Sequence, residues 1–211
     1  DGKVVELMTA ELGEPHVLAR TMSAAVVGPG LGLDPVARAL AIEASMRIEV
    51  PTVLDADALS ALAADGPEAL RAAAGPRLLT PHPGEAARLL GVSTREIQAD
   101  RYAAATRLAA RAGHVVVLKG AGTVIASPSG RVAVCPLGTP ALGVAGTGDV
   151  LSGVLGAMLA SGADPFEAAC AGVLLHARAG ELAARTDRGL LAREVADQVP
   201  VALAEARRLT A

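Results

Sequence analysis

The segment VVVLKGAGTVIASPSGRVAV, residues 115–134, contains three short runs rich in β-branched residues, and these runs decide the fold class. Val115–Lys119, Thr123–Ser127 and Arg131–Val134 are each predicted to be β-strands. Only the tripeptide Pro-Ser-Gly at 128–130 separates the last two, which leaves no room for a crossover helix. These two strands are therefore predicted to pair as an antiparallel hairpin.

Outward from this segment, short apolar runs alternate with longer helical patterns. Further strands are predicted at Ala24–Val27, Thr52–Leu54 and Leu78–Thr80. Helices are predicted at Thr94–Ala112, Val150–Ala160, Asp164–Ala184 and Leu191–Arg208, the last with a break or kink at Pro200. Such alternation is typical of βαβ units. The sequence therefore predicts an α/β domain around a largely parallel sheet.

Composition narrows the possible functions. The chain has 211 residues, 52% of them hydrophobic, with a net charge of −3, one Tyr, one Phe and no Trp. The net negative charge and the scarcity of aromatic residues argue against binding to nucleic acid. The apolar runs are too short or too rich in glycine to cross a membrane, and no targeting signal is visible. Cys135 and Cys170 are interpreted as small buried residues of a reducing compartment, so we expect a cytoplasmic protein.

Four successive strands are followed by glycines or ionisable residues. In chain order these stretches are Gly28–Gly32, Asp55–Asp57, Pro81–Glu85 and Lys119-Gly120. Parallel strands place their carboxyl ends at one edge of the sheet, where ligands bind. The first stretch is no dinucleotide-binding motif, because Leu33 stands where that motif needs its third glycine. A tight glycine turn that admits a ligand, or a plain strand-to-helix turn, remains open for it.

The stretch Ala145-Gly146-Thr147-Gly148-Asp149 leads directly into the predicted helix 150–160. Its glycines leave backbone N–H groups free to converge at the positive end of a helix, which is an anion site. Asp149 in the first turn is then placed to take a proton from a hydroxyl that attacks a bound phosphate. The alternative is that Asp149 only complements the helix dipole.

Other ionisable residues have two interpretations each. Lys119 ends an apolar strand and suits a phosphate partner, or it is a snorkelling edge lysine. His82, fixed between two prolines, suits an orienting contact, or it is a surface histidine. Asp55 suits a ligand hydroxyl or a hydrated magnesium ion. His176, mid-helix among small apolar residues, is predicted to be a core histidine with its polar atoms satisfied.

Several longer segments, taken together, resemble a known family. They occur in the order VVGPGLG, PTVLDADAL, LLTPHPGEAARLLG, VVVLKGAGTVIASPSGRV and AGTGDVLSGVLGAMLASGADPFEAACAGVLLHA, from about Val26 to the end of the chain. Together they resemble the C-terminal domain of nucleotide-dependent NAD(P)H-hydrate dehydratases. The resemblance implies a ribokinase-like three-layer α/β/α fold and a single domain, residues 1–211. It also leads us to expect that the family's opening segment is missing before Asp1.

The resemblance implies a repair reaction catalysed by a carbon–oxygen lyase. ADP or ATP, with Mg²⁺, phosphorylates the hydroxyl of the hydrated nicotinamide of (S)-NADHX or (S)-NADPHX, and phosphate then leaves to restore NADH or NADPH. Asp149 is expected to be the catalytic base. The expected nucleotide-binding residues are Lys119, Gly120, Ala121, Gly122, Thr123, Gly146, Thr147 and Gly148. The expected substrate-binding residues are Gly30, Gly32, Asp55, His82 and Asp149, and no side chains are assigned as dedicated metal ligands.

The resemblance also implies partners and shows departures. The expected partners are the small-molecule substrates, a second copy of the chain in a homo-oligomer and possible fusion to an upstream epimerase domain, with no nucleic acid or membrane partner. Where the family usually has Asn-Pro, this chain has Thr139-Pro140, and Ala145-Gly146 stands where two glycines are common. Ala145 is therefore expected to adopt an ordinary backbone conformation.

Two other hypotheses compete with the dehydratase. One is a small-molecule kinase of the same superfamily, acting on a vitamin precursor and sharing the GTGD stretch at 146–149. The other is a non-catalytic nucleotide-binding remnant.

Overall fold

The computed structural model describes residues 19–208, which form a six-stranded sheet in the order β1-β2-β3-β4-β5-β6. The first four strands run parallel, and the last two pair antiparallel. Their bounds are β1 Ala25–Val27, β2 Thr52–Leu54, β3 Arg77–Leu79, β4 Val115–Leu118, β5 Val124–Ala126 and β6 Val132–Val134. The predicted parallel sheet and its hairpin are confirmed, with strand ends shifted by a residue or so.

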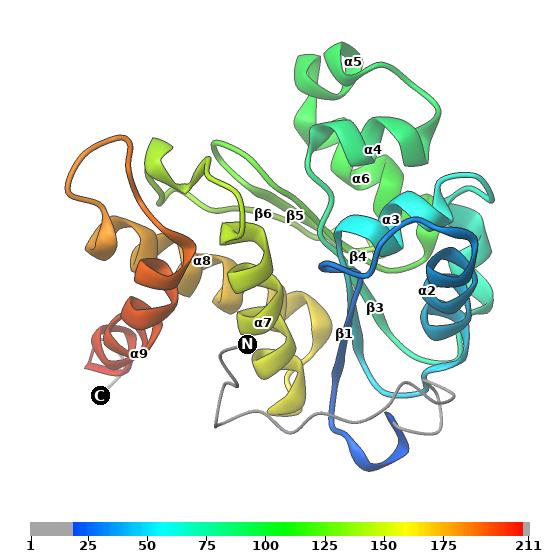
Figure 1. Cartoon of the computed structure of the whole chain (residues 1–211). Helices are drawn as coiled ribbons and strands as arrows, with labels where there is room; N and C mark the ends of the chain where they lie inside the picture. Colours follow the sequence, from blue (N-terminus) through cyan, green and yellow to red (C-terminus); the bar gives the residue numbers. More distant parts are fainter. Residues whose placement is uncertain (1–18, 209–211) are drawn as a thin grey trace.

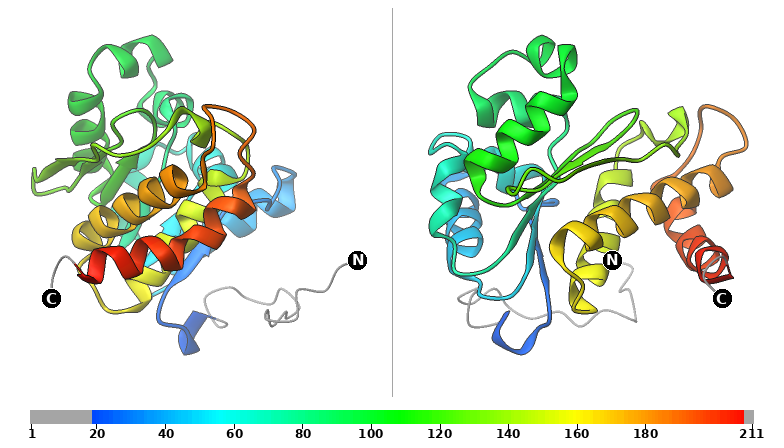
Figure 2. Two further views of the ribbon diagram at one scale, coloured as in Figure 1. Left: turned by 90° about the vertical axis from the view of Figure 1, so that its left-hand side faces the viewer. Right: turned by 180° about the vertical axis from the view of Figure 1, so that it is seen from behind.

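Helices cover both faces of the sheet (Figures 1 and 2). One layer holds α2 Pro35–Arg47, α3 Ala56–Leu62, α4 Pro83–Leu90, α5 Thr94–Ala99 and α6 Arg101–Ala112. The other holds α7 Thr147–Ala160, α8 Pro165–Ala183 and α9 Ala192–Arg208, with α9 packed on α8. Short 3₁₀ turns complete the chain at η1 Ala19–Thr21, η2 Pro67–Ala72 and η3 Pro140–Leu142.

Side chains of the sheet alternate between the two helical layers, as the pleat of a strand requires. Leu54, Leu79 and Val116 pack in the cluster with α3, α4 and α6. Their neighbours Val53 and Leu78 pack in the cluster with α7 and α8. Because both faces are buried, the central strands read as continuous apolar runs. The fold is thus the three-layer α/β/α arrangement.

The prediction of one helix over 94–112 was wrong, because the chain breaks at Asp100. Asp100 has an extended backbone (φ −148°, ψ 89°), and its carboxylate accepts a hydrogen bond from the Ala103 amide at 2.9 Å. Aspartate is a strong helix N-cap, so it starts a new helix in preference to continuing the old one. As a result, Arg101 is the first residue of α6.

Of the break or kink predicted at Pro200, the break was wrong, since α9 runs through this residue. A proline removes one amide donor and leaves the carbonyl four residues earlier without its helical bond. Here Pro200 and Ala196 are both exposed, so water can satisfy that carbonyl. Val195 and Ala202, on either side, are buried and keep the helix docked.

The tertiary fold brings the start of helix α7 to the edge of the sheet at which the parallel strands end. It follows β6 in the chain but packs beside β1 and β2, at the other side of the sheet. Its first residues therefore lie over the carboxyl ends of strands that come about a hundred residues earlier. Within residues 19–208, no helix is long and apolar enough to span a membrane.

Gly28 directly follows β1, and its backbone lies close to the backbone of Asp55. A substitution of Gly28 tests this close approach. Gly28 has φ +124°, and an added Cβ would stand 1.8 Å from the Asp55 carbonyl oxygen. Gly28→Ala should therefore lower the free energy of unfolding by roughly 3 kcal/mol. The matched control is Gly153→Ala, in the interior of α7 with open space around its Cβ position. That change should stabilise the protein by about 0.5–1 kcal/mol, because alanine favours a helix. Urea unfolding measures both, and equal effects would contradict the assigned contact.

Candidate active site

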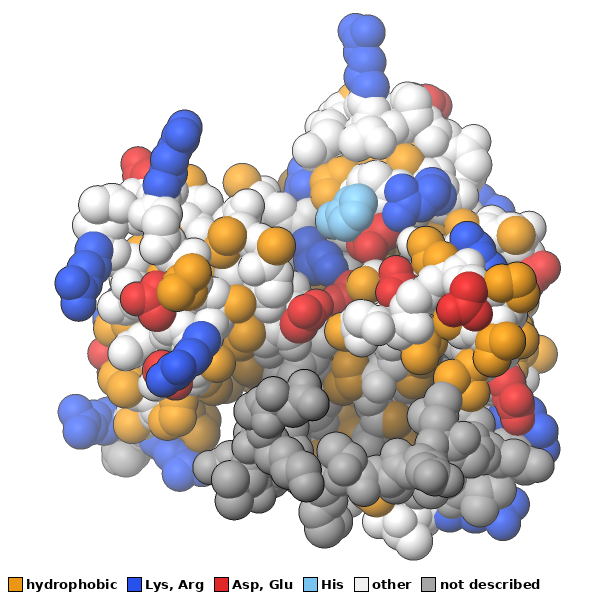
Figure 3. All heavy atoms as spheres, in the orientation of Figure 1, with side chains coloured by type: hydrophobic (Ala, Val, Ile, Leu, Met, Phe, Trp, Pro, Cys, Tyr) orange, Lys and Arg blue, Asp and Glu red, His pale blue; other side chains and the backbone are white. Residues whose placement is uncertain are grey.

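The site lies where β2, β3 and β4 end and α7 begins. Figure 3 shows that this face of the molecule is hollowed between the α7 side and the α3–α4 side, and that acidic and basic side chains gather in the hollow. Four separate stretches of sequence are linked here: 28–32 is bonded to 55–57, and 82–85 adjoins Lys119 of 119–123. Asp55 and Lys119 lie beside Gly148 of the loop 145–149.

The loop 145–149 has the geometry of an anion site. Gly146 is the N-cap of α7 with φ +89°, and no side chain caps this helix start. The Thr147 hydroxyl instead donates within the preceding turn, to the carbonyls of Leu142 at 2.8 Å and Val144 at 2.9 Å. Asp149 is exposed in the first turn. The first amides of α7 thus have no side-chain cap and lie at the positive end of the helix dipole.

His176 of α8 holds this loop from behind. Its Nε2–H donates to the Thr147 carbonyl oxygen at 2.9 Å, and the ring is buried. Burial lowers the pKa of His176 to about 4, so the ring is neutral at pH 7. The prediction of a satisfied core histidine is confirmed, and its partner is the first residue of α7.

A buried ion pair connects β4, β2 and α7. Lys119 Nζ lies 2.6 Å from Asp55 Oδ1, while Ser152 of α7 donates to Asp55 Oδ2 at 2.8 Å. The side chain of Asp55 is 2% exposed and that of Lys119 is 20% exposed. A Cβ on Gly148 would lie 3.5 Å from Lys119 Nζ. The ammonium group is therefore held next to the second glycine of the anion loop, which favours the phosphate-partner interpretation over a snorkelling lysine.

The backbone directly after Asp55 is strained, next to the ion pair between Asp55 and Lys119. Ala56 has φ +47°, a conformation that non-glycine residues rarely adopt. Asp55 is the N-cap of α3, yet its carboxylate makes no capping bond. The carboxylate turns to Lys119 and Ser152 instead, so the unusual backbone coincides with a side chain diverted from its local role.

His82 is fixed by a capping box. Its Nδ1 accepts hydrogen bonds from the amides of Gly84 at 2.9 Å and Glu85 at 3.3 Å, and Glu85 Oε2 accepts from the His82 amide at 2.7 Å. With Nδ1 as acceptor, the neutral ring carries its proton on Nε2, on a side chain half exposed. Glu85 is buried, and its Oε2 lies 4.0 Å from Lys119 Nζ, which links this turn to the ion pair.

Other predicted residues border this centre. Gly32 donates its amide to Asp57 Oδ2 at 2.8 Å, so the 28–32 turn is tied to the stretch that carries Asp55. The loop 119–123 is closed by a bond from the Thr123 hydroxyl to the Gly120 carbonyl at 3.0 Å. Gly120, Ala121 and Gly122 are exposed along it.

Sequence analysis placed Asp57 and Glu85 in the stretches that follow two predicted strands but gave them no role, and it did not single out Arg101 or Ser152. Two of these residues carried a readable signal. Glu85 stands three residues after His82, the spacing of a capping box, although histidine is an unusual cap. Ser152 follows Gly148 by one helical turn and so shares its face of α7. Nothing local marks Ser152 as the partner of an aspartate 97 positions away.

The two departures from the family pattern are accommodated. Thr139 caps η3, its hydroxyl accepting from the Ala141 amide at 3.3 Å, as an asparagine side chain also can. Among the residues described, Ala56 is the only non-glycine with positive φ, so Ala145 has the ordinary backbone predicted for it.

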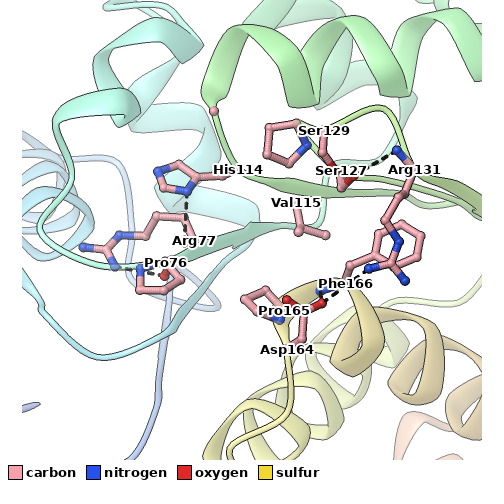
Figure 4. A pocket seen from close by; sticks show the side chains of 12 residues that line it. Pro76, Arg77, His114, Val115, Ser127, Ser129, Arg131, Asp164, Pro165 and Phe166 are labelled. Atoms are coloured by element: carbon pink, nitrogen blue, oxygen red, sulfur yellow. Dashed lines mark hydrogen bonds and ion pairs between the residues drawn. The ribbon is translucent and has the colours of Figure 1, made fainter.

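A cavity of about 260 Å³ lies at the opposite edge of the sheet, where β3 and β4 begin (Figure 4). Its polar side chains already have partners. Arg131 pairs with Glu167 and lies 4.2 Å from the centroid of the Phe166 ring, and His114 Nε2 bonds to the Leu70 carbonyl at 2.9 Å. The cavity is thus remote from the strand ends that hold the ion pair.

Comparison with known proteins identifies the family. A family model described as NAD(P)H-hydrate dehydratase matches residues 2–200. The chain belongs to the NAD(P)H-hydrate dehydratase family. Its fold agrees with a solved structure of the ADP/ATP-dependent NAD(P)H-hydrate dehydratase from Bacillus subtilis, co-crystallised with ATP and Mg²⁺ (TM-score 0.78, 34% identity, 90% of this chain and 69% of that one). A ribokinase-like protein from Enterococcus faecalis, 24% identical with a TM-score of 0.76, supports the ribokinase-like fold.

Two curated relatives are longer than this chain. The ADP-dependent (S)-NAD(P)H-hydrate dehydratase of Neisseria meningitidis is 46% identical over 181 residues, 83% of this chain and 61% of that protein. The bifunctional NAD(P)H-hydrate repair enzyme Nnr of Moorella thermoacetica is 44% identical over 194 residues, 91% of this chain but 35% of that protein. This chain thus spans about a third to three fifths of these two curated relatives.

The buried histidine predicts an acid-sensitive stability. Because the folded ring binds a proton less readily than the unfolded chain does, the unfolded state gains the proton between pH 6.5 and about 4, and acid favours unfolding in that window. His176 should contribute a slope of up to about 1.4 kcal/mol per pH unit there. His176→Gln keeps a donor for Thr147 but cannot titrate. Unfolding measured from pH 7 to 4 should show a shallower loss in the variant, whereas parallel losses would refute the assignment.

The ion pair predicts that substitutions of Lys119 and Asp55 have non-additive effects on the free energy of unfolding. Lys119→Met leaves the buried Asp55 carboxylate without its cation and should cost about 3 kcal/mol of unfolding free energy. Adding Asp55→Asn removes the uncompensated charge, so the double variant should be more stable than Lys119→Met alone. Arg193→Met is the control, since Arg193 is 89% exposed in its pair with Asp197 and should contribute little. Additive losses in the double variant would contradict the buried pair.

Proposed function

We propose that this chain catalyses the ADP- or ATP-dependent dehydration of (S)-NADHX and (S)-NADPHX to NADH and NADPH. The observation that carries the proposal is the position of Asp149. Its exposed carboxylate stands in the first turn of α7, directly after the Gly146–Gly148 loop, and no side chain caps the helix start. Lys119 adds a positive charge beside the same loop. A base next to an anion site is what phosphoryl transfer to a hydroxyl requires.

In this proposal the nucleotide lies along two loops. Its terminal phosphate is held by the amides of Gly146, Thr147 and Gly148, with the Lys119 ammonium balancing the charge that develops during transfer. The remainder of the nucleotide lies along Gly120–Thr123, whose exposed glycines admit a ligand close to the backbone.

The hydrate is placed on the other side of Asp149. Gly30 and Gly32 belong to the turn tied to Asp57, and His82 offers an Nε2–H donor on a rigid cap. Asp55 is 1% exposed and has both oxygens engaged. Asp55 therefore does not contact the hydrate directly in this proposal, and it acts by holding Lys119 and Ser152 beside the anion loop.

The chemistry follows in two steps. The hydroxyl oxygen of the hydrate attacks the terminal phosphorus, its proton passes to the Asp149 carboxylate, and the bond from phosphorus to the leaving nucleotide breaks. The carbon–oxygen bond of the phosphorylated hydrate then breaks, phosphate leaves with the bonding pair, and a proton is lost from the neighbouring carbon. The ring double bond that results is that of the reduced nicotinamide.

Magnesium would reach this site with the nucleotide. Mg²⁺ commonly keeps several waters and binds through one or two carboxylates together with substrate phosphates. Asp55 and Glu85 adjoin Lys119 but are already bonded, Asp55 to Lys119 and Ser152 and Glu85 to the His82 amide, so the nucleotide phosphates would be the main ligands of the metal. When bound, the metal would neutralise charge on the nucleotide phosphates.

Assembly and location complete the proposal. We infer self-association through the exposed side of β6, where Val132 and Val134 present apolar surface at the edge of the described sheet. Both cysteines are free thiols, which suits action in the reducing cytoplasm. The length of the Moorella relative and its bifunctional name are compatible with an epimerase domain in the same polypeptide.

Recovery of reduced-nicotinamide absorbance tests the function. The full polypeptide, NADHX, Mg²⁺ and either ADP or ATP should restore the near-ultraviolet band and release free phosphate. Asp149→Asn should lower the rate by at least about 100-fold, because it removes the base. Asp65→Asn, at an exposed turn, is the matched control and should keep the wild-type rate.

Three results would redirect the assignment. A phosphorylated alcohol accumulating from vitamin-precursor substrates, without phosphate release, would favour the kinase alternative. Nucleotide binding without turnover of any substrate would favour the remnant. Wild-type activity in Asp149→Asn would show that Asp149 is not the catalytic base.

A further inference from the structure

The loop 119–123 is held from outside by a single guanidinium group. Arg101 Nη2 donates to the carbonyl oxygens of Leu118 at 3.1 Å, Lys119 at 3.3 Å and Gly122 at 3.4 Å. These carbonyls lie at both ends of the loop, where β4 stops and before β5 begins. One side chain from α6 therefore spans the loop and fixes the distance between its two ends.

The backbone of the loop is shaped to receive this group. Gly120 has φ +140°, and a Cβ built on it would lie 2.7 Å from Arg101 Nη1 and 3.1 Å from Nη2. Any other residue at 120 would collide with the guanidinium and would also be strained. Gly120, one of the expected nucleotide-binding residues, therefore also leaves room for the guanidinium group of Arg101 against the loop.

Arg101 occupies a place that is unfavourable for a cation in two respects. It is the first residue of α6, where the helix dipole disfavours positive charge. It is also half-buried, and this burial lowers its pKa. The break at Asp100 creates this position, because a continuous helix over 94–112 would not begin here. The bonds to the loop are what offset these costs.

We propose that Arg101 is a positioning residue that sets the affinity of this protein for its nucleotide by holding the loop 119–123 in its ligand-ready shape. The proposal rests on the assignment of that loop to the nucleotide. A loop ordered before binding loses less conformational entropy when the ligand arrives, so affinity rises. The hydrate side of the site, at residues 28–32 and 82, makes no bond to Arg101 and should not respond.

The conservative variant Arg101→Lys provides the test. Lysine keeps the charge but lacks the planar fork that reaches several carbonyls at once. In the full polypeptide, we expect the Kd for ADP and for ATP to rise about 5- to 10-fold by isothermal titration, in parallel with the nucleotide KM. The KM for NADHX and kcat should stay within about twofold of wild type. Arg107→Lys, at an exposed position of the same helix, should change none of these values.

A second variant and a direct binding measurement keep the outcome decisive. Arg101→Met should weaken nucleotide binding further than Arg101→Lys, and thermal unfolding shows whether each variant is folded. The proposal is overturned if folded Arg101→Lys binds nucleotide as wild type does, or if it loses hydrate affinity and kcat to the same extent. The titration needs no turnover, so wild type that binds nucleotide but restores no NADH would fail the proposed function while the Arg101 comparison still stands.

Discussion

The ion pair between Lys119 and Asp55 joins the end of β4 to the end of β2, and the Ser152 hydroxyl extends it to α7. A buried carboxylate is stable in such a place only if it is paired and its remaining lone pairs are bonded, which is the arrangement found for Asp55. The pair fixes the height of α7 over the sheet. It thereby fixes Gly148, whose Cβ position lies close to both charges. The contact to Ser152 thus ties α7 to the strand ends, while His176 holds the anion loop from behind through Thr147.

Close packing of small residues lets α7 come near enough for that contact. The chain has a single Phe and no Trp, so its layers approach through glycine and alanine. A Cβ on Gly156 of α7 would lie 2.8 Å from the Val26 side chain in β1, and one on Gly172 of α8 would lie 2.7 Å from Leu155 in α7. Interiors packed at this density transmit position accurately. Helix dipole and ammonium group are thus preset before any ligand binds, as electrostatic catalysis requires.

In the proposed reaction, the loops assigned to the nucleotide and to the hydrate are held by different hydrogen bonds. The loop 119–123 is braced by Arg101 from α6, while the hydrate side is braced by local bonds, Gly32 to Asp57 and His82 to Glu85. Asp149 stands in the first turn of α7, which His176 holds through Thr147. Each side of the site can therefore change its affinity without moving the base, which is how an enzyme of this fold can alter its substrate while keeping its phosphoryl chemistry.

The sequence by itself determined what acts over a few residues. The strands, the hairpin over 124–134 and the core role of His176 follow from local backbone preference and hydrophobic pattern. The helix α7 begins at Thr147, three residues before its predicted start at Val150. The family motifs added the expected chemistry of Asp149. Only the tertiary structure decided that Asp55 serves Lys119, 64 positions away, and that Ser152 completes the pair. It also decided that Asp100 splits a helix and brings Arg101 to the loop after β4. Such partners are chosen by packing across the whole chain. A buried charged side chain is stable only where it has a polar or charged partner, and sequence spacing does not show which distant residue packing will bring to it.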